Sequence, residues 1–288
     1  MHNKAVQFID KTSDIVYSVG METKQRPLKT LQLANVIAFV VTVTFNVLST
    51  ALPLNGRTPE EISDALPSYF TPAGYTFSIW GIIYLALLGF TIYQALPAQR
   101  EQPLVRRIGW LFVLSSVANV GWLLSWHYGF YAASVVFMVG LLLTLVAVYV
   151  RLRISYPAAD LTLPQRLFTH LPFSLYLGWI TVATIANIAS VAGHYGWDGL
   201  GIAGQVWSAI MMGVAVVVAG LLLLNRRNLA YGAVLVWAFF GIRAAYPDEP
   251  IITTAAVLAA ALVAALAVLG YVRTRSAAVK ASGRLAAA

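Results

Sequence analysis

Long apolar runs separated by short polar loops constrain this chain more than any other feature of its sequence. Eight runs lie at roughly residues 31–52, 74–96, 107–127, 130–150, 167–193, 204–224, 229–246 and 251–272. A helix of about 20 apolar residues crosses the roughly 30 Å of hydrocarbon in a bilayer. Lipid tolerates only backbones whose hydrogen bonds close on themselves, and runs this long are helices rather than barrel strands. The sequence therefore predicts an all-α polytopic membrane protein with about eight transmembrane helices.

Composition agrees with this fold class and excludes others. The chain is 59% hydrophobic and 10% charged, with a mean hydropathy of +0.75, and a soluble domain of this length could not hide so much apolar surface. The net charge of +8 would suggest nucleic acid as a partner in a soluble protein. Here the basic residues lie between apolar runs, so the loops explain the charge. Cysteine is absent, which excludes disulfides and thiol chemistry.

The basic residues also predict the orientation of the chain. Seventeen of the 19 Lys and Arg residues fall on one side of the predicted topology, and only Arg57 and Arg243 fall with the other side. Because cytoplasmic loops carry the excess of Lys and Arg, both termini are expected in the cytoplasm. The protein itself is expected in the inner (plasma) membrane of a bacterium. Residues 1–30 are expected as a cytoplasmic segment without a signal peptide. Residues 274–288 are expected as a flexible basic tail.

Two helix starts can be read from capping patterns. Thr58-Pro59-Glu60-Glu61 combines a capping box with proline at the first helical position, which predicts a short helix in the extracytoplasmic loop 53–73. Thr162-Leu163-Pro164-Gln165 is a weaker pattern that predicts a turn leading into the fifth run.

Several kinds of chemistry are missing from the apolar runs. No Asp, Glu or Lys lies in the middle of a run, which argues against a carboxylate-driven proton pump and excludes a retinal Schiff base. His127 and His194 lie near the outer ends of two runs, and two imidazoles at one depth could ligate a haem iron. The alternative, hydrogen bonding to water and lipid headgroups, is favoured, and no metal site is predicted.

Aromatic residues are the most suggestive side chains. The stretch 67–89 begins as a proline-containing loop and becomes a helix with closely spaced rings, among them Tyr69, Phe70, Tyr75, Phe77, Trp80 and Tyr84. Such rings serve either as interfacial anchors or as the wall of a site for a flat apolar ligand. Trp122 and Trp126 are four residues apart and share one helix face. Trp179 lies mid-run, where its indole N–H needs a buried acceptor, and Asn119 or Asn187 could supply it.

Three motifs on successive runs resemble the TspO/MBR family, the tryptophan-rich sensory or translocator proteins. The first comprises Pro67, Thr71-Pro72, Phe77, Trp80 and Tyr84; the second is Asn119-Val120-Gly121-Trp122; the third runs from Tyr176 through Trp179 and Ala183 to Asn187. The family's loop usually has tryptophan where this chain has Tyr69 and Tyr75. The resemblance covers roughly residues 31–195 and leaves the three runs within 196–273 as additional helices.

The resemblance implies a five-helix bundle with a pocket roofed by the first extracytoplasmic loop. The expected ligand is a large apolar ring, most of all a tetrapyrrole such as a porphyrin or haem, with no cofactor required and no enzymatic activity assigned. With Trp126 added because it shares a helix face with Trp122, the predicted ligand-binding residues are Tyr69, Tyr75, Phe77, Trp80, Tyr84, Asn119, Trp122, Trp126, Trp179, Ala183 and Asn187. Tyr69 and Tyr75 are expected in the lid.

Two other functions remain open at this point. The chain could be an uncoupled transporter of small molecules, with the last three helices completing the path. It could also be an accessory subunit whose extra helices dock another membrane complex. The expected partners are lipid, a hydrophobic small molecule and either a second copy of the chain or another membrane protein, and not nucleic acid.

Overall fold

The computed structural model describes residues 28–52, 54–100, 102–154, 161–226 and 228–286, with side chains of the last helix described as far as residue 273. The described residues are helical and contain no strand. The long helices are α2 (Leu28–Ala51), α4 (Ile79–Ala95), α6 (Leu111–His127), α7 (Tyr131–Arg151), α9 (Leu171–His194), α10 (Gly204–Arg226), α11 (Leu229–Ala245) and α12 (Pro250–Ala286). The short elements are η1 (Leu54–Gly56), α3 (Pro59–Asp64), η2 (Gly74–Ser78), η3 (Pro97–Gln99), α5 (Pro103–Ile108), α8 (Leu163–Gln165), η4 (Arg166–His170) and η5 (Gly199–Gly201).

The predicted all-α polytopic fold is confirmed. Within the described residues, six helical stretches are long and apolar enough to cross a membrane, and α6 and α11 are shorter apolar helices. Nearly all of the predicted segment 1–30 lies outside the described residues. Helix α12 continues to Ala286, through most of the stretch 274–288 that was expected as a flexible tail. Alanine is the strongest helix former, and this stretch is rich in it.

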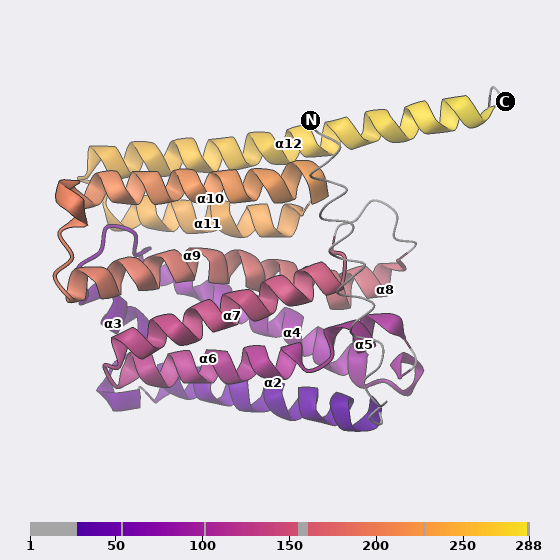
Figure 1. Ribbon diagram of the computed structural model, residues 1–288, viewed down its shortest axis with the longest axis horizontal. Helices are drawn as coiled ribbons and strands as arrows, with labels where there is room; N and C mark the ends of the chain where they lie inside the picture. Colours follow the sequence, from indigo (N-terminus) through magenta and orange to yellow (C-terminus); the bar gives the residue numbers. More distant parts are fainter. Residues whose placement is uncertain (1–27, 53, 101, 155–160, 227, 287–288) are drawn as a thin grey trace.

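The helices form two units that lie side by side (Figure 1). Helices α2, α4, α6, α7 and α9 make the first unit, and α10, α11 and α12 make the second, with α9 and α11 in contact between them. A Cβ on Gly178 of α9 would lie 3.2 Å from the backbone oxygen of Tyr231, so glycine allows close approach. The Tyr231 hydroxyl also donates to Oγ1 of Thr181 at 3.2 Å. The second unit is therefore packed firmly onto the first.

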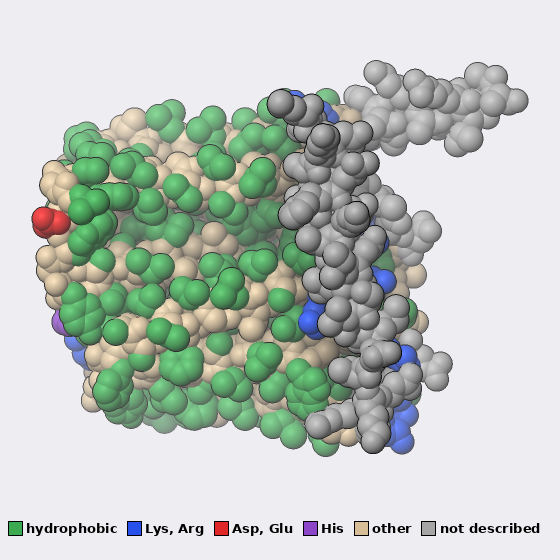
Figure 2. Space-filling model, in the orientation of Figure 1, with side chains coloured by type: hydrophobic (Ala, Val, Ile, Leu, Met, Phe, Trp, Pro, Cys, Tyr) green, Lys and Arg blue, Asp and Glu red, His purple; other side chains and the backbone are tan. Residues whose placement is uncertain are grey.

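The surface of the helix bundle is apolar around its middle and charged at its two ends. Leu85, Val136 and Leu221 are exposed, whereas Leu141 and Phe173 are fully buried. In Figure 2 hydrophobic side chains cover the middle of the visible face, basic residues gather toward one end, and an acidic patch lies at the opposite end. This distribution matches the surface of a protein that spans a bilayer.

A widened turn leads into α9. Pro172 lacks a backbone N–H and its ring crowds the carbonyl four residues earlier, and the segment η4 just before it is a π-helix. The predicted cap at Thr162 is present, since its hydroxyl accepts from the backbone N–H of Gln165 at 3.4 Å.

Candidate ligand-binding site

A short lid covers the outer end of the first unit. The lid is defined here as residues 59–78, which comprise α3, the loop 65–73 and η2. The predicted capping box starts it, because the Thr58 hydroxyl accepts from the Glu61 N–H at 3.3 Å and the Glu61 carboxylate accepts from the Thr58 N–H at 2.7 Å. The indole N–H of Trp126 on α6 donates to the carbonyl of Pro59 at 3.2 Å. This bond ties α3 to the bundle beneath it.

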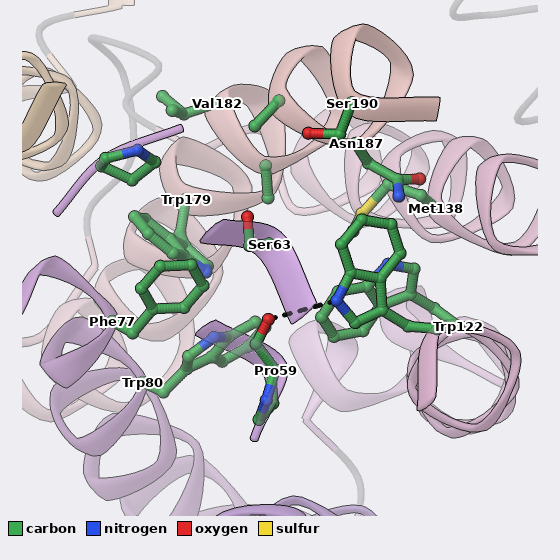
Figure 3. A pocket seen from close by; sticks show the side chains of 14 residues that line it. Pro59, Ser63, Phe77, Trp80, Trp122, Met138, Trp179, Val182, Asn187 and Ser190 are labelled. Carbon is green, nitrogen blue, oxygen red and sulfur yellow. Dashed lines mark hydrogen bonds between the residues drawn. The ribbon is translucent and has the colours of Figure 1, made fainter. Parts of the chain in front are cut away.

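Below the lid, aromatic side chains enclose a cavity (Figure 3). Its lining residues come from α3, the loop, η2, α4, α6, α7 and α9, and they are Pro59, Ser63, Pro72, Phe77, Trp80, Trp122, Trp126, Met138, Trp179, Val182, Ala183, Ala186, Asn187 and Ser190. Four of these residues are tryptophans, and most of the remainder are apolar. The free space inside is about 40 Å³, room for a few water molecules at most. A drug-sized ligand needs about 300 Å³ or more, so a large ligand requires the cavity to enlarge.

Trp80 is the centre of the aromatic cluster. Its ring stacks on Tyr84, with centroids 5.3 Å apart and planes 15° apart. Trp122 lies 6.5 Å away in a near-parallel orientation, and Trp179 meets Trp80 edge-on at 6.1 Å. Trp122 in turn stacks on Trp126 at 6.3 Å, which confirms that these two residues share a face. Aromatic pairs in such geometries each contribute about 0.5–1.5 kcal/mol beyond their burial.

Three hydrogen-bonding groups of the cavity wall lack partners among the described residues. They are the indole nitrogens of Trp122 and Trp179 and the hydroxyl of Ser190, and the three side chains are at most 7% exposed. The amide oxygens expected to pair with Trp179 accept from other donors: Oδ1 of Asn119 accepts from the Asn46 amide at 2.7 Å, and Oδ1 of Asn187 accepts from the Ser134 hydroxyl at 3.4 Å. The wall therefore offers buried N–H donors to an acceptor atom, and buried donors of this kind are normally paired.

Asn119 occupies the floor beneath the aromatic cluster instead of pairing with Trp179. Its amide oxygen accepts from Asn46 of α2 at 2.7 Å, and its amide nitrogen donates to the Tyr176 hydroxyl of α9 at 3.0 Å. Asn119 is fully buried, and these bonds join three helices. Asn119 and Tyr84 therefore support the cavity from below rather than line it.

Seven of the eleven residues predicted to bind a ligand line the cavity; they are Phe77, Trp80, Trp122, Trp126, Trp179, Ala183 and Asn187. Tyr69 and Tyr75, expected in the lid, belong to it but do not line the cavity. Tyr69 lies against Tyr246 with ring centroids 5.7 Å apart, and Tyr75 meets Trp237 edge-on at 5.5 Å. The roof is formed instead by Pro59, Ser63 and Pro72.

Sequence reasoning missed the lining residues that have no distinctive chemistry. Met138 of α7 and Val182, Ala186 and Ser190 of α9 line the cavity but look like ordinary membrane-helix residues. Helical spacing could have found part of this set, since Ala186 and Ser190 follow Trp179 and Ala183 on one face of α9.

In the described part of the chain, no group of three or more His, Asp or Glu side chains is placed to hold a metal ion. Nδ1 of His127 lies 2.7 Å from the carbonyl oxygen of Leu123, one turn earlier. His194 packs edge-on against Tyr131 with centroids 4.7 Å apart. The first contact lies within α6, and the second joins α9 to α7.

Two carboxyl groups of α3, those of Glu60 and Asp64, have a raised pKa. Partial burial raises the pKa of Asp64 above its ordinary value. Burial also raises the pKa of Glu60, and the charges of Asp64 and Glu61 add to that shift. A raised folded-state pKa means that the contribution to stability is complete below the ordinary value of about 4 and is lost as the pH rises through the raised value.

We therefore expect Asp64→Asn to stabilise the protein slightly at neutral pH, because it removes a partly desolvated charge. The melting temperature in detergent should rise by about 1 °C at pH 7, and this advantage should shrink as the pH falls toward 4. Asp248→Asn, outside the lid, is the control. A constant difference across this pH range would contradict the assignment to Asp64 ionisation.

The fold and the site together define a class of protein: a polytopic helical membrane protein with a tryptophan-walled cavity beneath a short lid. A family model described as TSPO-like protein matches residues 32–269, so the chain belongs to the family of TSPO-like proteins. Searches of curated proteins and of solved structures give no match. The match extends beyond residues 31–195, over which the motifs were recognised, and includes α10, α11 and most of the apolar part of α12.

Proposed function

We propose that this TSPO-like protein binds a large apolar ring molecule of the tetrapyrrole class in the cavity beneath the lid, as a membrane sensory or binding protein. The observation that carries the proposal is a wall of four tryptophans, two of which bury indole N–H groups that have no partner within the part of the chain that the structure describes. Flat rings stack on flat rings, and a buried donor gains most from an acceptor on the ligand. A porphyrin or haem provides both, through its flat ring and its carboxylate acceptors.

The position of the site supports access from outside the cytoplasm. The lid lies at the end of the bundle opposite the segments that contain Arg106, Arg107, Arg151 and Arg166. The excess of Lys and Arg on one side orients a membrane protein with that side in the cytoplasm. We place both termini in the cytoplasm of a bacterial cell and the lid on the outer face of its inner membrane.

The direct test is a titration of the purified protein in lipid nanodiscs with protoporphyrin IX, followed by tryptophan quenching and by the porphyrin absorbance band. We expect saturable binding that weakens about tenfold, or 1.4 kcal/mol, in Trp122→Leu and Trp179→Leu. Trp207→Leu is the matched control, because Trp207 packs against Trp197 at 5.3 Å and does not line the cavity. Equal affinity in all three variants would show that the porphyrin binds elsewhere.

The same preparation separates binding from transport. A protein that only binds gives no flux of porphyrin across proteoliposomes, whereas an uncoupled transporter does. A stoichiometric membrane partner in every purification would instead indicate an accessory subunit.

A further inference from the structure

Helices α10 and α11 contact α9 of the first unit, and α11 also contacts η2 of the lid. The lid contacts are hydrogen bonds to its main chain. Trp237 of α11 donates its indole N–H to the carbonyl of Thr76 at 3.0 Å. A second bond runs in the opposite direction: the backbone N–H of Ala73 in the lid donates to the carbonyl of Gly241 in α11 at 3.0 Å.

Two further bonds hold the middle of the lid. The hydroxyl of Tyr246, directly after α11, donates to the carbonyl of Ser68 at 2.6 Å. The hydroxyl of Ser208 on α10 donates to the carbonyl of Tyr69 at 2.7 Å. Burial raises the pKa of Tyr246 to about 12, so its hydroxyl keeps its proton at neutral pH. Four bonds thus fix the lid backbone at positions 68, 69, 73 and 76.

Glycines permit this close approach. A Cβ on Gly241 would overlap the side chain of Thr76, which is fully buried between the lid and α11. A Cβ on Gly204, the first residue of α10, would lie 2.7 Å from Cδ2 of Tyr69. The surfaces of α10 and α11 that contact the lid are therefore complementary to it in shape.

A second hollow lies on the other side of the lid. It has a volume of about 500 Å³ and is polar, and its lining residues are Ser63, Asp64, Leu66, Pro67, Ser68, Thr71, Ala73, Gly74, Ala245 and Tyr246. Ser63 lines both this hollow and the aromatic cavity. Thr71 lines the hollow and the adjacent Pro72 lines the cavity, so the loop alone separates the two spaces there. A shift of the loop into the hollow would join them.

From this arrangement we propose that α10 and α11 form a clamp on the lid and that release of the clamp opens the aromatic cavity to the outer hollow. Trp237 is a positioning residue in this clamp: it holds η2 through its indole N–H and Tyr75 through its ring. The clamp gives the additional three-helix unit a role in the binding site. The consequence for ligand access rests on the proposed function, whereas the clamp itself does not.

A buried reporter in the lid tests the clamp without any ligand. The chain contains no cysteine, and Thr71 is 3% exposed, so Thr71→Cys reacts with a water-soluble maleimide only when the lid opens. Trp237→Phe keeps the ring but removes the donor, and Ser208→Ala removes the bond to Tyr69. Trp207→Phe is the matched control, because it removes an indole bond of 2.7 Å to Gly199 in the adjoining loop.

We expect the labelling rate to rise about fivefold in Trp237→Phe and in Ser208→Ala, as the loss of one hydrogen bond of about 1 kcal/mol implies, and to stay unchanged in Trp207→Phe. The double variant should label faster than either single one. Circular dichroism establishes that each variant is folded. Equal labelling rates in the clamp variants and the control would overturn the clamp.

Stopped-flow mixing with protoporphyrin IX then tests ligand access. Opening the lid more often should raise the association and dissociation rates of Trp237→Phe together, about fivefold, and change the Kd much less. Faster labelling with unchanged porphyrin rates would overturn control of access by the clamp. If porphyrin does not bind at all, the proposed function fails, while the labelling result still decides whether α10 and α11 hold the lid.

Discussion

Replacing Gly241 with alanine should destabilise the protein by about 1–3 kcal/mol, the usual penalty of overpacking a tight interior contact. The new methyl group would overlap Thr76, whose side chain is fully buried and β-branched and therefore has few rotamers available to avoid it. The overlap pushes the lid away from α11. The same displacement would lengthen the hydrogen bond that Trp237 of α11 donates to the Thr76 carbonyl. Thermal unfolding in detergent and Thr71→Cys labelling should both report the change.

The control for this substitution is Gly213→Ala on α10. A Cβ there meets nothing within 4 Å, and alanine favours helix over glycine by about 1 kcal/mol. We therefore expect Gly213→Ala to be neutral or stabilising. Thr76→Ala should recover part of the loss in Gly241→Ala, and the double-mutant cycle measures their coupling. Equal melting temperatures for Gly241→Ala and Gly213→Ala would mean that the lid does not pack on α11 as described.

The transmembrane architecture could be predicted from the sequence because lipid leaves few alternatives. The run predicted at 204–224 corresponds to α10 at Gly204–Arg226, and the run at 229–246 corresponds to α11 at Leu229–Ala245. The Thr58 capping box was also predictable, since its partners are three residues apart. Helix boundaries and local caps depend on neighbours along the chain, which the sequence displays directly.

The roles of individual side chains were harder to predict because they depend on distant partners. Trp179 was expected to donate to Asn119 or Asn187, but both amide oxygens accept from other donors and the Trp179 N–H has no partner among the described residues. Tyr69 and Tyr75 were assigned to the lid by family position, yet their rings pack on residues from α11 onward. No local pattern encodes contacts over more than 150 residues of sequence.

The use of the last three helices could not be read from their sequences at all. These helices contain no recognisable motif, and their apolar residues are similar in kind. Gly241 and Trp237 resemble common membrane-helix and interfacial residues. Only the three-dimensional arrangement shows that both meet the lid. The same arrangement agrees with the family match, which runs through these helices to residue 269.

Replacement of Asn119 with leucine, which branches at the same carbon, should destabilise the protein by about 2 kcal/mol. The change removes the bonds to Asn46 and to the Tyr176 hydroxyl, and Tyr176 is only 2% exposed. A single bond between membrane helices contributes about 0.6 kcal/mol on average, but leaving a buried polar group without a partner costs about 1–3 kcal/mol. The orphaned Tyr176 hydroxyl therefore dominates the expected loss.

Two further variants separate that orphaned hydroxyl from a general loss of packing. Asn119→Leu combined with Tyr176→Phe removes both partners, so it should be more stable than Asn119→Leu alone. Thr144→Val is the control, because the Thr144 hydroxyl bonds within its own helix, to the Leu141 carbonyl, and should change stability by no more than about 0.5 kcal/mol. Equilibrium unfolding in mixed micelles with increasing dodecyl sulfate measures all three. If Tyr176→Phe gives no recovery, the network beneath Trp80 does not hold α2, α6 and α9 together in the way its geometry implies. If it does, weaker porphyrin binding by Asn119→Leu should recover with it, because Tyr176 meets Trp80 edge-on at 5.9 Å and positions the ring at the centre of the cavity wall.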